Sequence, residues 1–155
     1  MDTLVRLLTR ESLLVELLVF KLVELRQLLL SGETRFLGWA SEEVERATDS
    51  VRSAELERAV LITALGRERG IDEPTLTEIV ADAPAPWQGL LSELQDQLLR
   101  HAHESASVLQ VTRRLAEAGS RSINETLESL SGSSPGAYGG PTTHGRVQAR
   151  YGQGF

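Results

Sequence analysis

Apolar residues recur at alternating steps of three and four along the first thirty positions. Leucine or valine occupies positions 4, 8, 15, 18, 22, 25 and 29, and only Glu11 interrupts the series. This spacing predicts a long amphipathic helix with a heptad seam. A second stripe beside the seam consists of Leu7, Leu14, Leu17 and Leu28. The apolar face is therefore wide, and we expect it to pack against two neighbours in a bundle.

The pattern stops at Ser31-Gly32 and predicts a second helix from about residue 34 to residue 65. Its apolar positions are mostly Ala and Val, which lets two helices approach closely. Gly66, Gly70 and Pro74 are expected to end it. Pro74 then opens a short helix through residue 81, because proline is favoured in a first turn.

A final long helix is expected from about Pro86 to Leu130. Gly119 and scattered Ser and Thr lower the intrinsic helicity of its second half. Trp39 and Trp87, near two helix starts, are interpreted as packing caps. Beyond Ser131 the chain is rich in Gly and lacks Leu and Ile, which predicts a disordered tail over 132–155.

These patterns predict an all-α fold with a helical domain over residues 1–131. Its long antiparallel helices form a helical hairpin or bundle, with about three long helices and one short helix.

Residues 1–128 hold all 22 acidic residues and 14 of the 16 basic ones, a net charge of −8 that would repel nucleic acid. The most apolar stretch, residues 13–30, carries four charges, so membrane insertion is not expected. The chain has no cysteine and no basic start typical of a signal peptide, which fits a reducing compartment.

Candidate chemistry is sparse. His101, His103 and Glu104 are close in sequence, but only the first and last share a helix face, and no His-Glu-x-x-His motif accompanies them. We therefore interpret these three residues as part of a solvated helix face. The acidic runs alternate with arginine as on a solvated helix surface. No phosphate loop, dinucleotide fingerprint or nucleophile elbow occurs. We therefore expect no catalysis, no metal and no cofactor.

The order of these features resembles the FlgN family of flagellar type III export chaperones. The resemblance rests on the leucine-rich helix over residues 11–30, the break at Ser31-Gly32, the second helix closing with Leu65-Gly66, and a long last helix that runs into Ala137-Tyr138-Gly139-Gly140. It implies a cytoplasmic chaperone that covers terminal amphipathic helices of hook-filament junction proteins, the hook-associated proteins, and delivers them to the export apparatus.

A cargo groove is placed on the last helix, where a partner helix could bury its apolar stripe. The residues expected to line it are Leu109, Leu115, Ile123, Leu127 and Leu130. Tyr138, at the Tyr-Gly position of the tail, is the expected contact with the export gate component. A weak homodimer is compatible with this interpretation. The alternative is a coiled-coil scaffold or adaptor without secretion cargo that self-associates through the seam from Leu4 to Leu29; a constitutive tight oligomer would favour it.

Overall fold

A computed structural model describes residues 1–132, and the side chains of residues 1–129. The described chain is helical and contains no strand, which confirms the all-α prediction. The elements are α1 (Asp2–Ser31), η1 (Thr34–Phe36), α2 (Leu37–Arg69), α3 (Leu76–Ala81) and α4 (Ala85–Gly132). Clustering of contacts divides the chain into a unit of residues 1–121 and a second unit that begins at Ser122. The tail predicted from residue 132 lies, from 133 onward, outside the described residues.

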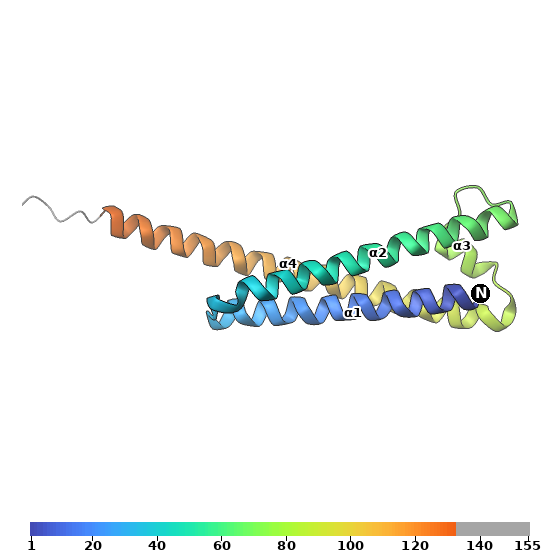
Figure 1. Ribbon diagram of the computed structural model, residues 1–155, viewed down its shortest axis with the longest axis horizontal. Helices are drawn as coiled ribbons and strands as arrows, with labels where there is room; N and C mark the ends of the chain where they lie inside the picture. The colour runs from blue at the N-terminus through green and yellow to red at the C-terminus, as the bar shows by residue number, and fades with distance from the viewer. Residues whose placement is uncertain (133–155) are drawn as a thin grey trace, which may run out of the picture. The chain divides into compact units, whose positions relative to one another are not determined.

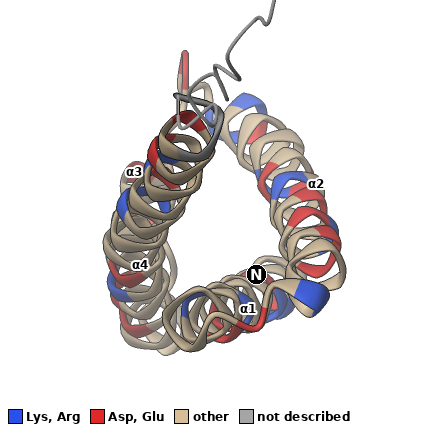
Figure 2. Ribbon diagram, turned by 90° about the vertical axis from the view of Figure 1, so that its left-hand side faces the viewer, with Lys and Arg blue, Asp and Glu red and all other residues tan. Residues whose placement is uncertain are grey.

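Within residues 1–121, three long helices pack along one another. The helices α1 and α2 form an antiparallel pair joined by η1, and α4 runs beside α1 in the same direction (Figure 1). Seen along their axes, the three helices stand at the corners of a triangle, with α3 at one end (Figure 2). The apolar face of α1 is therefore in contact with two neighbours; Leu14 of the second stripe packs against the core, whereas Leu17 of the same stripe is exposed.

The core is built from aliphatic side chains at the helix spacing expected from the sequence. Its buried members are Leu4, Leu8 and Val15 of α1, Val51 and Ile62 of α2, Ile79 and Val80 of α3, Ala83, and Leu91, Leu94 and Leu98 of α4. Five of the six seam positions from 4 to 22 are buried in this chain's own bundle: Leu4, Leu8, Glu11, Val15 and Leu22. This part of the seam is thus already occupied within one chain, which argues against the self-association of the scaffold alternative.

The first helix ends where the sequence predicts. Gly32 adopts φ 73°, a left-handed conformation that glycine tolerates best, and its N–H donates to the carbonyl of Leu28. The N–H of Glu33 donates to the same carbonyl at 3.2 Å. These two bonds satisfy the free end of α1 and turn the chain into η1.

The second helix extends to Arg69, so the prediction that it ends near residue 65 was wrong by one turn. Gly70 terminates it with φ 69°, and Ile71 N–H donates to the Gly66 carbonyl at 2.9 Å, as in a Schellman motif. Gly66 lies inside the helix for another reason. A Cβ at this position would overlap the ring of Pro74. Glycine here allows close packing and does not break the helix.

Pro74 does not open α3, contrary to the sequence prediction. The helix is capped by Thr75, whose hydroxyl accepts from Glu78 N–H at 3.2 Å, while Thr75 N–H donates to the Glu78 carboxylate at 2.8 Å. This reciprocal capping box places Pro74 one residue before the cap. The hydrogen bond that the Glu78 carboxylate accepts from the Thr75 backbone N–H also lowers the pKa of Glu78.

Candidate functional site

The one polar interruption of the α1 seam is matched by a cation from α2. Glu11 is 1% exposed, and Nε of Arg58 donates to its two carboxylate oxygens at 2.8 and 3.1 Å. Burial raises the pKa of the Glu11 carboxyl, while Arg58 acts in the opposite direction. The Arg58 side chain remains 27% exposed. The pair fixes α1 against α2, because a shift along either helix would leave a charge buried alone.

The same level of the bundle holds a contact between α1 and α4. Ser12 is 2% exposed, and Nδ1 of His101 lies 3.2 Å from both its hydroxyl and its carbonyl oxygen. The sequence interpretation of His101 as a residue of a solvated face was therefore wrong, because it is half-buried against α1. Together with Glu11 and Arg58, these side chains form a polar layer that sets the register of all three long helices.

This register determines how far α1 accompanies α4. The two helices run in the same direction and rise equally per residue, so the offset between Ser12 and His101 places Ser31 beside about residue 120 of α4.

The apolar side of α4 continues past this level. Residues about 18 apart lie on one line of a helix, since five turns separate them. Leu91, Leu109 and Leu127 form one such line: Leu91 is 0% exposed, Leu109 is half-buried and Leu127 is 58% exposed. Ile123, one turn before Leu127, is 59% exposed. The stripe that builds the core at one end of α4 is thus open to solvent at the other.

The predicted groove residues do not all lie on one side of the helix. Leu109, Ile123 and Leu127 do, and residue 130 falls on the neighbouring line that also carries Leu94 and Thr112. Leu115 is half-buried and about 120° away from Leu109 around the helix axis. Nothing is described of the Leu130 side chain, and Tyr138 lies outside the described residues.

Hydroxyl side chains accompany this part of α4. Thr112 is 4% exposed and its hydroxyl donates to the Val108 carbonyl at 2.8 Å, and Thr126 donates to the Ser122 carbonyl at 2.9 Å. Such bonds back to the preceding turn compete weakly with the helix backbone. The low intrinsic helicity expected here from Gly119, Ser and Thr stays a prediction, because α4 is continuous to Gly132.

A second apolar surface lies at the η1 end of the α1–α2 pair. Trp39 is 69% exposed, and its ring centroid lies 5.9 Å from that of Phe36. Both rings line a cleft of about 480 Å³ with residues of α1, among them Val23 and Leu28. The interpretation of Trp39 as a packing cap is therefore wrong, whereas Trp87 packs against the core as expected.

The described residues offer little for catalysis. Residues 1–132 contain no group of three His, Asp or Glu side chains placed to hold a metal ion. None of the helices described is both long and apolar enough to cross a membrane. What this part of the chain does present is apolar surface on helices, which is the chemistry of recognition by packing.

Comparison with protein families gives one match over most of the chain. The family model described as FlgN protein matches residues 1–144, nearly the whole chain. No curated protein and no solved structure matches the chain. A match over this length shows the family, and the chain therefore belongs to the FlgN family of chaperones of flagellum biogenesis.

Proposed function

We propose that this chain is a cytoplasmic export chaperone without catalytic activity. It binds terminal amphipathic helices of hook-associated proteins and delivers them to the flagellar type III export apparatus. The observation that carries the proposal is the exposed continuation of the α4 stripe at Ile123 and Leu127, 59% and 58% exposed. The bound helix lies along Leu109, Ile123, Leu127 and Leu130, and Leu115, about 120° from Leu109 around the helix axis, lies outside its path.

The apolar area open at Ile123 and Leu127 supplies part of the binding free energy. Full burial of a large aliphatic side chain contributes about 1.5–3 kcal/mol. With more than half of each side chain still exposed, Ile123 and Leu127 together have about 2–4 kcal/mol to contribute. The ordering of a helix with weak intrinsic helicity reduces this gain. A moderate affinity suits a chaperone, because the cargo must be released at the export apparatus.

Substitution on two sides of α4 tests the groove. The perturbing variant is Ile123→Glu, and the matched control is Val111→Glu, which also replaces an exposed β-branched residue of α4 but lies about 120° away around the helix. We expect Ile123→Glu to weaken binding of a hook-associated terminal peptide at least about tenfold, measured by calorimetry. The reason is that a carboxylate replaces apolar surface that the bound peptide would cover. Val111→Glu should bind as the unchanged chain does.

Three results would argue against the proposal. If the Ile123→Glu chain bound the hook-associated peptide as tightly as the unchanged chain, the proposed binding groove would be wrong. Equal weakening by Val111→Glu would indicate a general loss of structure, which circular dichroism at 222 nm would reveal. If the chain purified from its own cells carried no hook-associated protein, the proposed cargo would be wrong.

Delivery is a separate step, and we assign it to Tyr138. The expected result of Tyr138→Ala is normal cargo affinity together with reduced secretion of hook-associated proteins. Loss of cargo binding in this variant would contradict the division of roles between the helix and the tail.

A further inference from the structure

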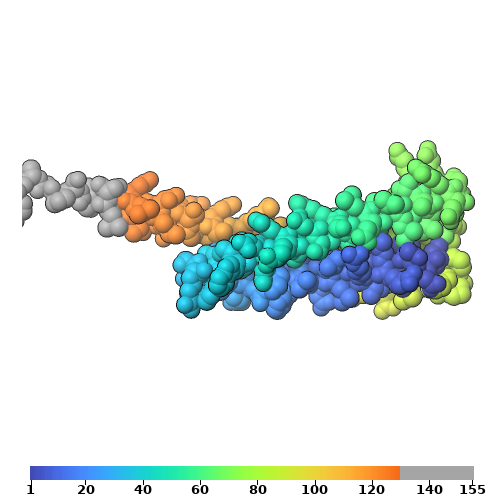
Figure 3. All heavy atoms as spheres, viewed as in Figure 1, coloured from blue at the N-terminus to red at the C-terminus, as the bar shows by residue number. Residues whose placement is uncertain are grey.

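The helix α1 has an outward stripe that the chain's own core does not use. It follows the same alternating steps as the buried seam and consists of Arg6, Arg10, Leu13, Leu17, Phe20 and Glu24. Leu13, Leu17 and Phe20 are 61%, 44% and 54% exposed. In the space-filling view, α1 faces the viewer along its length with no other segment lying over it (Figure 3).

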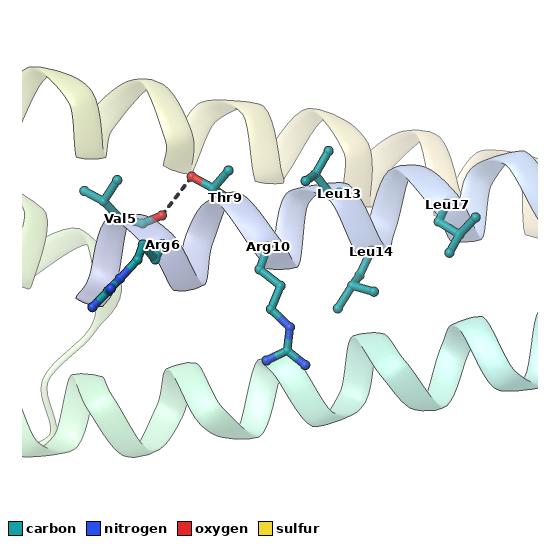
Figure 4. Close-up of a pocket in the computed structure, with 7 residues that line it drawn as sticks. All are labelled: Val5, Arg6, Thr9, Arg10, Leu13, Leu14 and Leu17. Atoms are coloured by element: carbon teal, nitrogen blue, oxygen red, sulfur yellow. Dashed lines mark hydrogen bonds between the residues drawn. The ribbon is translucent and has the colours of Figure 1, made fainter. Parts of the chain in front are cut away.

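The first half of this stripe borders a groove of about 530 Å³. Figure 4 shows its side chains along α1, with the Arg10 side chain reaching toward α2, where it pairs with Glu57 at 2.7 Å. Leu13, Leu14 and Leu17 supply most of the apolar lining. This surface is distinct from the α4 groove of the proposed function, because it lies on another helix.

The charges along the stripe have a direction. Arg6 and Arg10 precede the apolar centre, and Glu24 follows it. A second copy of α1 laid parallel would place the two arginines opposite their own equivalents. A copy laid antiparallel places Arg6 opposite Glu24, which Lys21 of its own helix also contacts at 2.8 Å, so that opposite charges flank the leucines, while Arg10 keeps its pair with Glu57.

We propose that two copies of this chain associate through the outward stripes of α1, antiparallel and about a two-fold axis near residues 15–17. Leu13 and Leu17 of each copy form the centre, and Arg6 of each faces Glu24 of the other. A stable protein–protein interface buries about 1,200–2,000 Å², and one stripe of one helix is at or below the lower end of that range. The dimer is therefore weak and depends on concentration.

Cross-linking of single cysteines tests both the interface and its direction, because the chain contains no cysteine of its own. Leu17→Cys lies near the axis and should cross-link to its own copy with a short bismaleimide. Arg6→Cys should not do so, because ten residues from the axis on each side separate the two thiols by about 30 Å. A mixture of Arg6→Cys and Glu24→Cys chains should give a mixed dimer. The control is Val60→Cys, 71% exposed on α2, which should remain monomeric.

Mass measurement on the full chain supplies the second test. Sedimentation from about 10 µM to 1 mM should show a monomer that becomes a dimer, and Leu17→Glu should remain a monomer with unchanged helicity. A wild-type chain that is monomeric throughout this range would overturn the proposal. Efficient self-cross-linking of Arg6→Cys would overturn the antiparallel arrangement. Loss of cargo binding in Leu17→Glu, with wild-type mass unchanged by concentration, would assign the stripe to cargo instead.

Discussion

Replacing Arg58 with leucine removes the cation from the polar layer and leaves the Glu11 carboxyl in place. The Glu11 side chain is 2% exposed, so its charge would be left in a buried position without its cation. Breaking a buried pair in this way costs about 3–5 kcal/mol. We expect Arg58→Leu to lose about that much free energy of unfolding at pH 7, measured by urea denaturation at 222 nm.

The reverse substitution should behave differently. In Glu11→Leu the Arg58 side chain, already 27% exposed, can extend its guanidinium into water along its apolar stem. Leucine at position 11 also completes the heptad seam of α1. We therefore expect Glu11→Leu to cost less than Arg58→Leu, and the double variant to be at least as stable as the unchanged chain, since well-packed apolar residues often replace a buried pair without loss.

The pH dependence of Arg58→Leu follows from the same carboxyl. Burial raises the pKa of Glu11 in the folded chain, so its contribution to stability is fully present below the ordinary value of 4.5 and is lost as pH rises through the folded value. Without Arg58 the pKa rises further and the loss is larger. The stability difference between variant and unchanged chain should therefore shrink as pH falls toward 4.5. A difference that is constant with pH, or equal costs for the two single variants, would refute this account of the polar layer.

Two further predictions concern the connection from α2 to α3. Gly66→Ala should destabilise the bundle by about 1–3 kcal/mol, because its Cβ would overlap Pro74, whereas Gly38→Ala, in open space within the same helix, should not; chemical denaturation of both variants checks this. The pKa of Glu78 is lowered by its bond from the Thr75 backbone, so the capping box contributes stability above pH 4.5 that is lost as pH falls through the folded value. In Glu78→Gln that acid-side loss should be absent from melting curves recorded between pH 6 and pH 3.

Periodicity was sufficient to predict the helices and their order, because each long helix presents a stripe that only burial explains. The end of α1 at Gly32 follows from a local signal, a glycine after the last apolar position. The end of α2 does not follow from such a local signal. Gly66 and Gly70 are both glycines in the sequence, and only the packing of Pro74 against Gly66 shows which one terminates the helix.

The candidate site depended on information that a single sequence does not carry. Glu11 could be recognised as the break in a seam, but its partner Arg58 lies 47 positions away. The sequence alone does not indicate which arginine of the second helix pairs with it. Within residues 1–121, the register of α1 against α4 depends on the contact between Ser12 and His101, which the sequence did not indicate. The apolar stripe of α4 was visible in the sequence, whereas the exposure of Ile123 was not.

The low helicity of the second half of α4 gives a last prediction, which connects the fold to cargo binding. In α4 a Cβ at Gly119 would meet nothing within 4 Å, so alanine fits there without strain. Alanine favours the helix by up to about 1 kcal/mol over glycine. If cargo binds along Ile123 and Leu127, part of its binding free energy is spent in ordering this turn.

Gly119→Ala removes some of that ordering cost before the cargo arrives. The expected result is an affinity for a hook-associated terminal peptide increased by up to about fivefold, with unchanged stoichiometry, since 1 kcal/mol corresponds to roughly that factor. Hydrogen exchange in the free chain should slow around residues 119–127 at the same time. Slower exchange without any gain in affinity would show that cargo does not use this stretch of α4. The proposed groove would then have to be abandoned, even though the family and the fold would stand.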